Sequence, residues 1–386
     1  MKKIILRMVL VSMIFIVFLS AAHPSKDELW KLRVMGKNPN SVVVMTRNVY
    51  VGGYIDRIMQ ATDPNQIPFL VAQSFQEVLS TNFYYRAEAL ADEILRGQPH
   101  LVGLQEISTI YRQSPGDYLF GNPFQANNLL FDYLQILMDA LAARGLEYEV
   151  SGVILNFDIE MPMFVGPDPY NPLHYDDVRL LDFDVVLNRK DVAVSNVTEQ
   201  NYQYFIPFGG IPIKRGFVAL DAGIGHKMYK FVSTHFESAD VVIGDRTIRR
   251  LQAEELMGYL SSAALPVIVV GDLNTEAPDG EAYQDFMAHG YIDAWTRNLV
   301  QPEIPGFTFG HDPDLRNTGL NLTKRIDLIL VKSGVGIRSR RNIGPVFAYV
   351  VGDELSDRIL FPDGTYVWPS DHAGVLALLR IPVLGN

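Results

Sequence analysis

The chain has 386 residues, 48% of them hydrophobic, and a formal net charge of −11 at pH 7. This length and composition allow one large buried core or two smaller ones. The absence of cysteine excludes disulfides, thiolate metal sites and thiol catalysis. The acidic balance argues against nucleic-acid binding through the overall field of the protein. It argues less against an enzyme, because acids around a divalent cation attract phosphate once the cation is bound.

Residues 1–22 predict a secretory signal peptide. Two lysines and an arginine precede the apolar run 8–19, and small residues at 20–22 supply a cleavage site. A membrane anchor is the less favoured alternative, because the run is shorter than the about 20 residues that a spanning helix needs. Without the segment, 386 − 22 = 364 residues remain, with a charge of 30 − 44 = −14. We therefore expect a secreted or periplasmic protein.

Strand-like and helix-like segments alternate through the first half of the chain. Short apolar runs predict buried strands at 42–45, 101–104, 148–157 and 181–187. Apolar residues at three- and four-residue steps predict helices over 65–79, 84–95 and 127–143. The segment 160–172 contains four prolines and is predicted to be an irregular loop, a feature that is often functional.

The second half continues the alternation. Strands are predicted at 216–221 and 230–234, joined by a glycine-containing turn that indicates a hairpin, and at 266–270, 326–331, 346–350 and 375–379. Helices are predicted at 247–260 and 281–289. Many strands are continuously apolar, which is typical of sheets covered on both faces. No linker divides the chain, so we predict one α/β domain over residues 23–386, with two packed sheets flanked by helices.

Polar residues with acid, amide or imidazole side chains stand at the edges of six of these apolar runs. They are Asn48, Glu106, His235, Asp272 with Asn274, Asp327, and Asp371 with His372. Hydrolysis of a phosphate ester needs a hard cation held by oxygen ligands, a base for water, and donors to the phosphoryl oxygens. This set supplies all of these residue types, which favours a metal-dependent site where the strand ends meet.

Each of these residues also has a structural interpretation. Glu106 ends a buried strand, where a charge is costly unless it is paired or ligates a metal. Asp272 and Asn274 project to the same side of an extended segment, although an ordinary turn would use the same residues. Asp327 lies in an apolar strand and needs a partner, which is either Arg325 or His372.

Taken together and in this order, the motifs resemble those of the endonuclease/exonuclease/phosphatase superfamily, the deoxyribonuclease I-like fold. The matching segments are Thr46-Arg-Asn48, Gly103-Leu-Gln-Glu106, Thr234-His235, Gly271-Asp-Leu-Asn274, Arg325-Ile-Asp327 and Ser370-Asp-His372. The resemblance implies a four-layer α/β/β/α sandwich, with two mainly antiparallel sheets flanked by helices. It also implies metal-dependent hydrolysis of phosphoester bonds by this single domain.

The resemblance implies a role for each motif residue. Asn48 and Glu106 would bind the catalytic cation, expected to be Mg²⁺ with Mn²⁺ or Ca²⁺ as alternatives, and Asp371 would lie close to it or to a second cation. Asn274 and His235 would contact the phosphate. The remaining roles fall to three residues: Asp272 would orient or activate water, Asp327 would orient His372, and the base is either Asp272 or His372.

One motif of the superfamily departs from the usual pattern. Many relatives have a strand ending in Ser-Arg between the glutamate and the first histidine. Here the corresponding strand ends in Asn188-Arg189. Arg189 is therefore predicted to bind substrate, with a solvated strand-end arginine as the alternative.

The substrate is expected to be a phosphodiester, with nucleic acid ahead of a phospholipid headgroup. A nuclease needs basic residues along its groove, for which the candidates are Arg246, Arg249 and Arg250, or the arginines at 338, 340 and 341. A sphingomyelinase-like or phosphoinositide hydrolase would touch the membrane peripherally through exposed apolar residues, here Met161, Met163, Phe164 and Tyr170. A small secreted phosphoester needs neither feature. A catalytically dead binding module is the remaining class, but it would be expected to lack a motif, and no feature calls for an obligatory protein partner.

Overall fold

The computed structural model describes residues 28–167, 170, 174–300, 302–334, 343–344 and 346–382. The predicted signal peptide and the basic cluster at 338–341 lie outside these residues. Among the residues that are described, no helix is long and apolar enough to cross a membrane.

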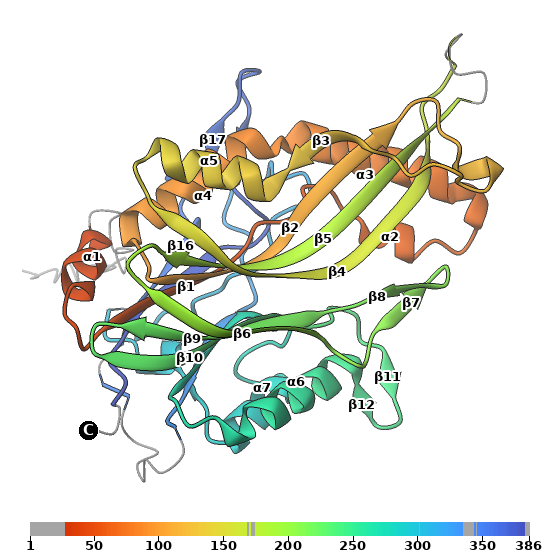
Figure 1. Ribbon diagram of the computed structural model, residues 1–386. Coiled ribbons are helices and arrows are strands. Elements are labelled where there is room, and N and C mark those ends of the chain that lie inside the picture. Colours follow the sequence, from red (N-terminus) through yellow and green to blue (C-terminus); the bar gives the residue numbers. More distant parts are fainter. Residues whose placement is uncertain are drawn as a thin grey trace, which may run out of the picture.

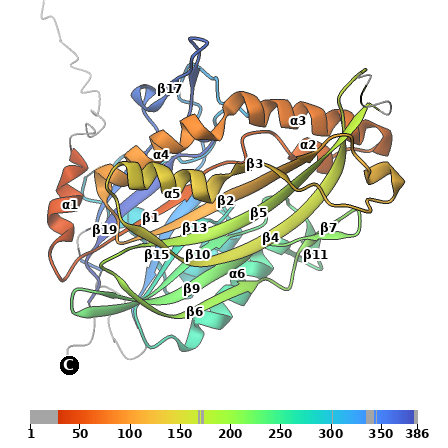
Figure 2. The same ribbon diagram turned by 45° about the horizontal axis from the view of Figure 1, so that its top comes forward.

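Two large sheets pack face to face (Figures 1 and 2). The first has the order β16-β19-β1-β2-β5-β4, with β3 paired to β2. Its strands are β1 (Val42–Asn48), β2 (Leu101–Gln113), β3 (Asn128–Asp132), β4 (Tyr148–Phe164), β5 (Tyr175–Arg189), β16 (Phe347–Val351) and β19 (Gly374–Leu379). Neighbours are antiparallel except β1 and β2, which are parallel.

The second sheet has the order β14-β15-β13-β10-β9-β6. Its strands are β6 (Ala193–Asn201), β9 (Gly216–Ile224), β10 (Lys227–His235), β13 (Val267–Asp272), β14 (Ile292–Asp293) and β15 (Asp327–Lys332). Again one central pair, β10 and β13, is parallel and the others are antiparallel. The predicted hairpin is confirmed as β9 and β10.

Helices cover the outer face of each sheet, as Figure 1 shows. The first sheet carries α1 (Trp30–Gly36), α3 (Ile67–Thr81), α4 (Phe83–Gly97) and α5 (Tyr133–Ala143), and α2 (Asp56–Met59) lies beside α3. The second carries α6 (Ile248–Tyr259) and α7 (Glu281–Ala288). Three large apolar cores result, one under each helical layer and one between the sheets. A smaller cluster of six buried residues includes Tyr50 and Trp368. The predicted four-layer sandwich is confirmed.

Shorter elements decorate the sandwich. Three two-stranded ribbons are β7 (Ile206–Phe208) with β8 (Ile211–Ile213), β11 (Val242–Ile243) with β12 (Arg246–Thr247), and β17 (Ile359–Leu360) with β18 (Tyr366–Val367). Single 3₁₀ turns are Pro64–Gln66, Tyr118–Phe120, Leu260–Ser262, Ala294–Arg297 and Leu355–Asp357. Of these, the β7–β8 hairpin lines an apolar cavity described below.

The helix predicted over 127–143 is wrong in its first turn. Residues 128–132 form β3 and pair with β2, and α5 begins only at Tyr133. The side chain of Asp132 caps that helix by accepting a hydrogen bond from the backbone N–H of Gln135 at 3.0 Å. Backbone pairing with β2 therefore outweighs the helical spacing of the leucines.

The irregular loop predicted over 160–172 is also wrong in its first part. β4 and β5 stay paired up to Phe164 opposite Tyr175, so residues 160–164 are strand. Met163 is only 3% exposed, and the ring of Phe164 packs 4.7 Å from that of Phe69. The predicted membrane contact is therefore wrong for Met163, whereas Phe164 is half-buried and its predicted contact stays a prediction. Tyr170 is 88% exposed, and Met161 is half-buried.

Candidate active site

Sheet register brings three of the predicted site residues side by side. Parallel pairing places His235, the last residue of β10, opposite Asp272, the last residue of β13. Antiparallel pairing places Asp272 opposite Asp327, the first residue of β15. The side chains therefore stand in a row at one edge of the second sheet. Gly271 permits this close pairing, because an added Cβ would overlap the carbonyl oxygen of Thr234.

The first sheet supplies the facing residues from the corresponding edge. Asn48 ends β1, and His372 comes just before β19, which runs antiparallel to β1. Glu106 lies in β2 where the register with β5 shifts, and its φ is +59°. An irregularity of this kind redirects a side chain out of the regular alternation of a strand. Here the irregularity turns the Glu106 side chain toward Asn48. The position of this candidate metal ligand therefore depends on a local distortion of the strand.

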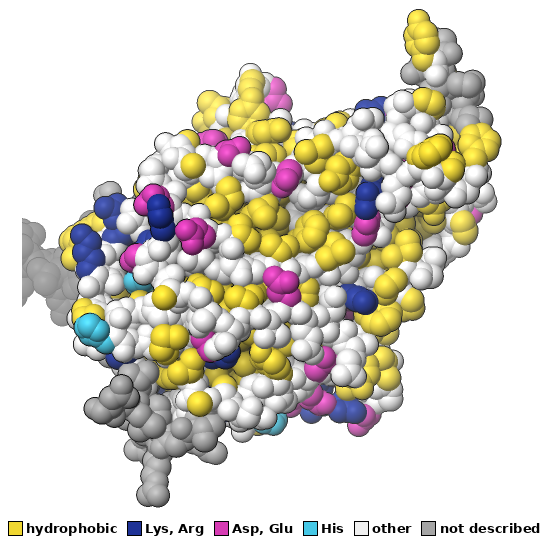
Figure 3. Space-filling model, viewed as in Figure 1, with side chains coloured by type: hydrophobic (Ala, Val, Ile, Leu, Met, Phe, Trp, Pro, Cys, Tyr) yellow, Lys and Arg dark blue, Asp and Glu magenta, His cyan; other side chains and the backbone are white. Residues whose placement is uncertain are grey.

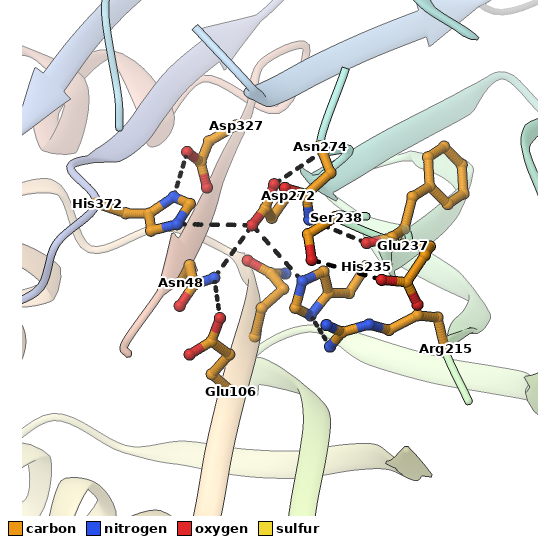
Figure 4. Close-up of polar contacts among 12 residues, drawn as sticks. Asn48, Glu106, Arg215, His235, Glu237, Ser238, Asp272, Asn274, Asp327 and His372 are labelled. Atoms are coloured by element: carbon orange, nitrogen blue, oxygen red, sulfur yellow. Dashed lines mark hydrogen bonds and ion pairs between the residues drawn. The ribbon is translucent and has the colours of Figure 1, made fainter. Parts of the chain in front are cut away.

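Asp272 is the centre of the site, as Figure 4 shows. Its Oδ2 accepts a hydrogen bond from Asn48 Nδ2 at 3.1 Å and lies 3.6 Å from His235 Nε2. The same oxygen is 3.7 Å from His372 Nε2. Its Oδ1 accepts from the backbone N–H of Asn274 at 3.0 Å. Burial, the largest cause, raises the pKa of Asp272, so this carboxylate is a more basic proton acceptor than an exposed aspartate.

His372 is held by a carboxylate on its far side. Its Nδ1 lies 2.8 Å from Asp327 Oδ2, and both side chains are buried. Arg325, the alternative partner for Asp327, instead pairs with Asp293 at 2.7 Å. Burial alone would lower the pKa of His372, but the neighbouring carboxylates, Asp327 first, outweigh burial and raise it to about 10. His372 is therefore an imidazolium at neutral pH, with Nε2 directed to Asp272.

The acids around Asn48 fit a hard divalent cation. Asn48 Nδ2 donates to Glu106 Oε1 at 2.9 Å, and the Asn48 oxygen accepts from the N–H of Tyr50. Burial, together with the charges of Glu106 and Asp272, raises the pKa of Asp371 to about 7. A buried group of mutually repelling carboxylates is relieved by a cation, and oxygen ligands are those that Mg²⁺ and Ca²⁺ prefer. The carboxylates are better placed to hold it than Asn48, whose amide nitrogen faces them.

Both Asn274 and Arg189 are predicted to contact the substrate, but only Asn274 lines the cleft. Asn274 lines the cleft, with its side-chain nitrogen donating to the carbonyl of Phe236 at 2.9 Å. Arg189 is the last residue of β5. Its side chain donates to the carbonyl of Gln98 at 2.8 Å and pairs with Asp191 at 2.6 Å. The predicted substrate contact through Arg189 is wrong, because the register of β5 puts its last residue far from Glu106.

The site also contains Asp182, Asp184 and Arg215, none of which was predicted from the sequence. Arg215 Nη1 lies 3.2 Å from His235 Nδ1 and 3.8 Å from Asp182 Oδ2. Asp184 Oδ1 is 3.5 Å from the same imidazole nitrogen. Burial would lower the pKa of His235, but Asp184 and Asp272 outweigh burial and raise it. The two aspartates had a signal: they alternate with apolar residues in one strand and so share a face.

His311 is a further imidazole of the cleft. It stacks on Trp368 at 4.0 Å, and its Nδ1 lies 2.9 Å from Asn317 Nδ2. Because an amide nitrogen can only donate, Nδ1 accepts and the proton is on Nε2, which has no partner among the described residues. Burial lowers the pKa of His311 to about 3. It is therefore a neutral hydrogen-bond donor in the wall of the cleft.

The cleft itself has about 870 Å³ of free space, part of it open to solvent, and its walls include the residues of both sheet edges. A second group of acids lies beside the long paired part of β4 and β5, which we call the β4–β5 arm. It consists of Asp117, Glu160 and Asp177. The carboxylates of Glu160 and Asp177 accept hydrogen bonds from backbone N–H groups, such as that of Ala126 to Glu160 at 3.0 Å. These two acids therefore already have hydrogen-bond partners.

Residues 78–372 match the Endonuclease/Exonuclease/phosphatase family. The match spans most of the chain, and the sheets and the site lie within or beside it. The chain therefore belongs to this family, whose enzymes are generally metal-dependent phosphoester hydrolases. No curated protein matches the sequence.

The chain is also similar to solved structures. An endonuclease/exonuclease/phosphatase family protein from Bacteroides thetaiotaomicron is 14% identical, with a TM-score of 0.52, over 89% of this chain and 96% of that one. Truncated TDP2 from Caenorhabditis elegans is 16% identical, with a TM-score of 0.47, over 88% and 98%. A mannosyl-6-phosphatase from Bacteroides thetaiotaomicron is 13% identical, with a TM-score of 0.49, over 88% and 99%. At such identities the first match supports the fold and says nothing about the substrate.

Proposed function

We propose that the chain is a divalent-metal-dependent phosphodiesterase in which Asp272 activates the attacking water. The observation that carries this proposal is the position of Asp272 Oδ2 between the Nε2 atoms of His235 and His372, at 3.6 and 3.7 Å. A general base must reach the proton it abstracts, and the two imidazoles beside it can donate hydrogen bonds to an anionic phosphate. Few structural roles would require a buried carboxylate in this position.

The protein residues divide the chemistry between them. Asp272 accepts a proton from water while Asn48 and the N–H of Asn274 hold its two oxygens in place. His372, kept as an imidazolium by Asp327, donates from Nε2 to a phosphoryl oxygen. A protonated His372 is not available as a base, which favours Asp272 for that role.

His235 and Arg215 act from the other side of the phosphate. The Nε atom of Arg215 is buried and has no hydrogen-bond partner among the residues the structure describes. Burial opposes the charge of Arg215, but Glu237 and the site aspartates raise its pKa, so it stays cationic. A guanidinium with a free N–H stabilises the negative charge that builds up on phosphoryl oxygens in the transition state.

Glu106 and Asp371, with Asp272 nearby, would hold the cation, and Mg²⁺ is the ion we expect. When bound, the cation withdraws charge from the phosphoryl oxygens and the leaving oxygen. The protein contributes a buried set of carboxylates whose mutual repulsion favours its binding.

Nucleic acid stays a predicted substrate that the described basic residues do little to support. Arg246 pairs with Glu254, and Arg250 pairs with Asp285 at 2.7 Å. Arg249 pairs with Asp240. A cluster whose charges are already neutralised adds little to phosphate binding along a groove. A lipid or a smaller phosphodiester is therefore an equal candidate on the charges of the described residues.

A substrate panel with Mg²⁺ or with excess EDTA tests the proposed function. The panel contains plasmid DNA, RNA, sphingomyelin, phosphoinositides and a chromogenic bis-phosphodiester. We expect at least the chromogenic substrate to be cleaved with Mg²⁺ and not with EDTA. Full cleavage in EDTA contradicts the metal-dependent mechanism, and no cleavage of any phosphoester contradicts the proposed function.

We also propose that the protein is exported. The basic start, short apolar run and small residues of segment 1–22 support this proposal. N-terminal sequencing of the protein from its native host should find a start near His23. An intact Met1 in a membrane fraction would favour the anchor instead.

A further inference from the structure

A second, apolar cavity adjoins the catalytic cleft. It lies between α2, α3, the β4–β5 arm and the β7–β8 hairpin, with about 850 Å³ of free space including its opening to solvent. Among the eighteen described residues that line it, the polar ones are Asp56, Ser74 and Arg215. We call this cavity the apolar annex. Figure 3 shows apolar side chains gathered where β4 and the β7–β8 hairpin face each other.

The apolar annex is continuous with the catalytic cleft. Val51, Ile55, Phe157 and Leu180 line both spaces, as do Asp56 and Arg215. Charged groups are therefore confined to the junction, beside the proposed phosphate position. A molecule whose phosphate contacts Arg215 can extend from there directly into the apolar annex.

The chemistry of the lining selects the occupant. The Ser74 hydroxyl is already used, because it donates to the carbonyl of Tyr54 at 2.8 Å. Beyond the junction, an entering group meets aliphatic and aromatic side chains such as Val71, Phe75 and Met161. A nucleobase or sugar would lose hydrogen bonds to water there without replacement, whereas a hydrocarbon group loses none.

We infer that the apolar annex binds the hydrocarbon group of an amphiphilic phosphoester whose phosphate occupies the catalytic cleft. This inference rests on the proposed function, since it takes the cleft as the phosphate site. It also places Met161 in a new role: its side chain faces an internal hydrocarbon site, in place of the predicted membrane contact.

Binding of a homologous series of ligands tests the inference without requiring turnover. Methyl, butyl, hexyl and octyl phosphate are titrated into the full protein with Mg²⁺ by isothermal calorimetry, each below its aggregation concentration. We expect Kd to fall by up to about fourfold per added methylene, the value for complete burial of a CH₂ group. A Kd that does not change from methyl to octyl phosphate would overturn the inference.

Two lining variants and a matched control show where the chain binds. Met161→Gln places an amide in the apolar annex at nearly the same volume, and Val178→Phe fills part of the space. Both should flatten the dependence on chain length while leaving methyl phosphate affinity within twofold. Leu129→Gln changes an exposed apolar residue outside the annex and should keep the wild-type dependence. If Met161→Gln and Val178→Phe, shown to be folded, both keep the wild-type dependence, the annex does not hold the chain.

Turnover separates this inference from the proposed function. Methyl and octyl p-nitrophenyl phosphate are hydrolysed in parallel with the binding series. If both are cleaved at equal efficiency and Kd shows no dependence on chain length, the proposed function stands and the annex inference fails. If neither is cleaved while Kd still falls with chain length, the annex stands and the proposed hydrolysis fails. The octyl ester in solution is then compared with a long-chain phosphodiester in phosphatidylcholine vesicles. Faster cleavage of the octyl ester indicates a soluble amphiphile, and faster cleavage in vesicles indicates a membrane lipid. Either result supports the inference.

Discussion

The catalytic cleft and the apolar annex share a wall but are built in opposite ways. The cleft is made of strand ends, and its charged side chains are positioned by sheet register, as with His235, Asp272 and Asp327. The apolar annex is made of helices and hairpins that pack around the sheet edge, and its lining is almost wholly apolar. Chemistry is therefore fixed by the core of the fold, whereas the elements around it are free to set the substrate.

The two regions also differ in electrostatic strain. In the cleft, burial, together with repulsion from neighbouring acids, raises the pKa of Asp182 and of Asp371 to about 7. In the apolar annex, the charged residues are Asp56 and Arg215, and both lie at the junction. Substitutions in the cleft should change rate and pH-dependent stability, and substitutions in the annex should change chain-length preference alone.

The largest effect is expected for Glu106→Ala. Removing this carboxylate should nearly abolish hydrolysis, because it takes away a proposed metal ligand and the partner of the Asn48 amide. Initial rates across a Mg²⁺ titration measure the effect, and circular dichroism checks the fold. Glu149→Ala, an exposed glutamate on the same sheet, is the control. A Glu106→Ala enzyme with unchanged Mg²⁺ dependence contradicts the assignment.

A large effect is also expected when His372 or its partner Asp327 is substituted. His372→Ala should reduce kcat by about 10²–10³-fold, the range for loss of one donor to a developing oxyanion. Asp327→Asn should reduce it less, because the imidazole stays but loses the carboxylate at 2.8 Å that keeps it charged. The double variant should be little worse than His372→Ala, since both changes remove one unit. Additive losses would show that the two residues act separately.

A moderate effect on stability is expected for Asp182→Asn. Burial, followed by repulsion from Asp184, raises the pKa of Asp182 from 3.8 to about 7. The folded state therefore holds this proton more tightly than the unfolded state, and the acid destabilises the fold progressively as pH rises from about 4 to about 7. In EDTA, the variant should gain on the order of 1–3 kcal/mol of unfolding free energy at pH 8 and almost none at pH 4. An equal gain at both pH values would contradict the electrostatic explanation.

The smallest effect is expected in the apolar annex. Met59→Gln changes a lining residue that is 38% exposed and far from the reacting groups. Turnover of methyl p-nitrophenyl phosphate should stay within about twofold of the wild-type rate, because Met59 lines the annex and does not line the catalytic cleft. A kinetic comparison with wild type under saturating Mg²⁺ measures it. A tenfold loss on this short substrate would show that the annex and the cleft are not separable.

Particular residues show how far the sequence predicts the site. The order of strand-end motifs predicted that Glu106 and Asp272 share one site, because charged residues beside buried strands need a chemical reason, and both residues line the same cleft. The same reasoning was available for Asp182 and Asp184, which alternate with apolar residues in β5. For Arg189 the prediction failed, since a strand-end arginine carries no information about which end of the sheet it will occupy.

Local patterns also misjudged two segments. Leucines at helical spacing predicted a helix through 128–132, where edge pairing with β2 gives a strand. Four prolines predicted a loop from residue 160, where pairing with β5 continues to Phe164. In both cases a long-range hydrogen-bonded ladder decides the structure, and a local window of sequence does not contain its partner.

The amino-acid sequence by itself determined which family the protein belongs to and which residue types its site contains. It is a cysteine-free α/β chain with acids, amides and two histidines at strand ends. It could do so because hydrolysis of a phosphoester needs those side chains wherever they are placed. Only the tertiary structure decided that Asp327 pairs with His372 in preference to Arg325, that Arg215 joins the site, and that an apolar annex opens beside it. The annex arises where segments between residues 51 and 215 meet in space, and the Asp327–His372 contact joins residues 45 apart in the sequence. The apolar pattern of each segment specifies its burial without specifying its neighbours.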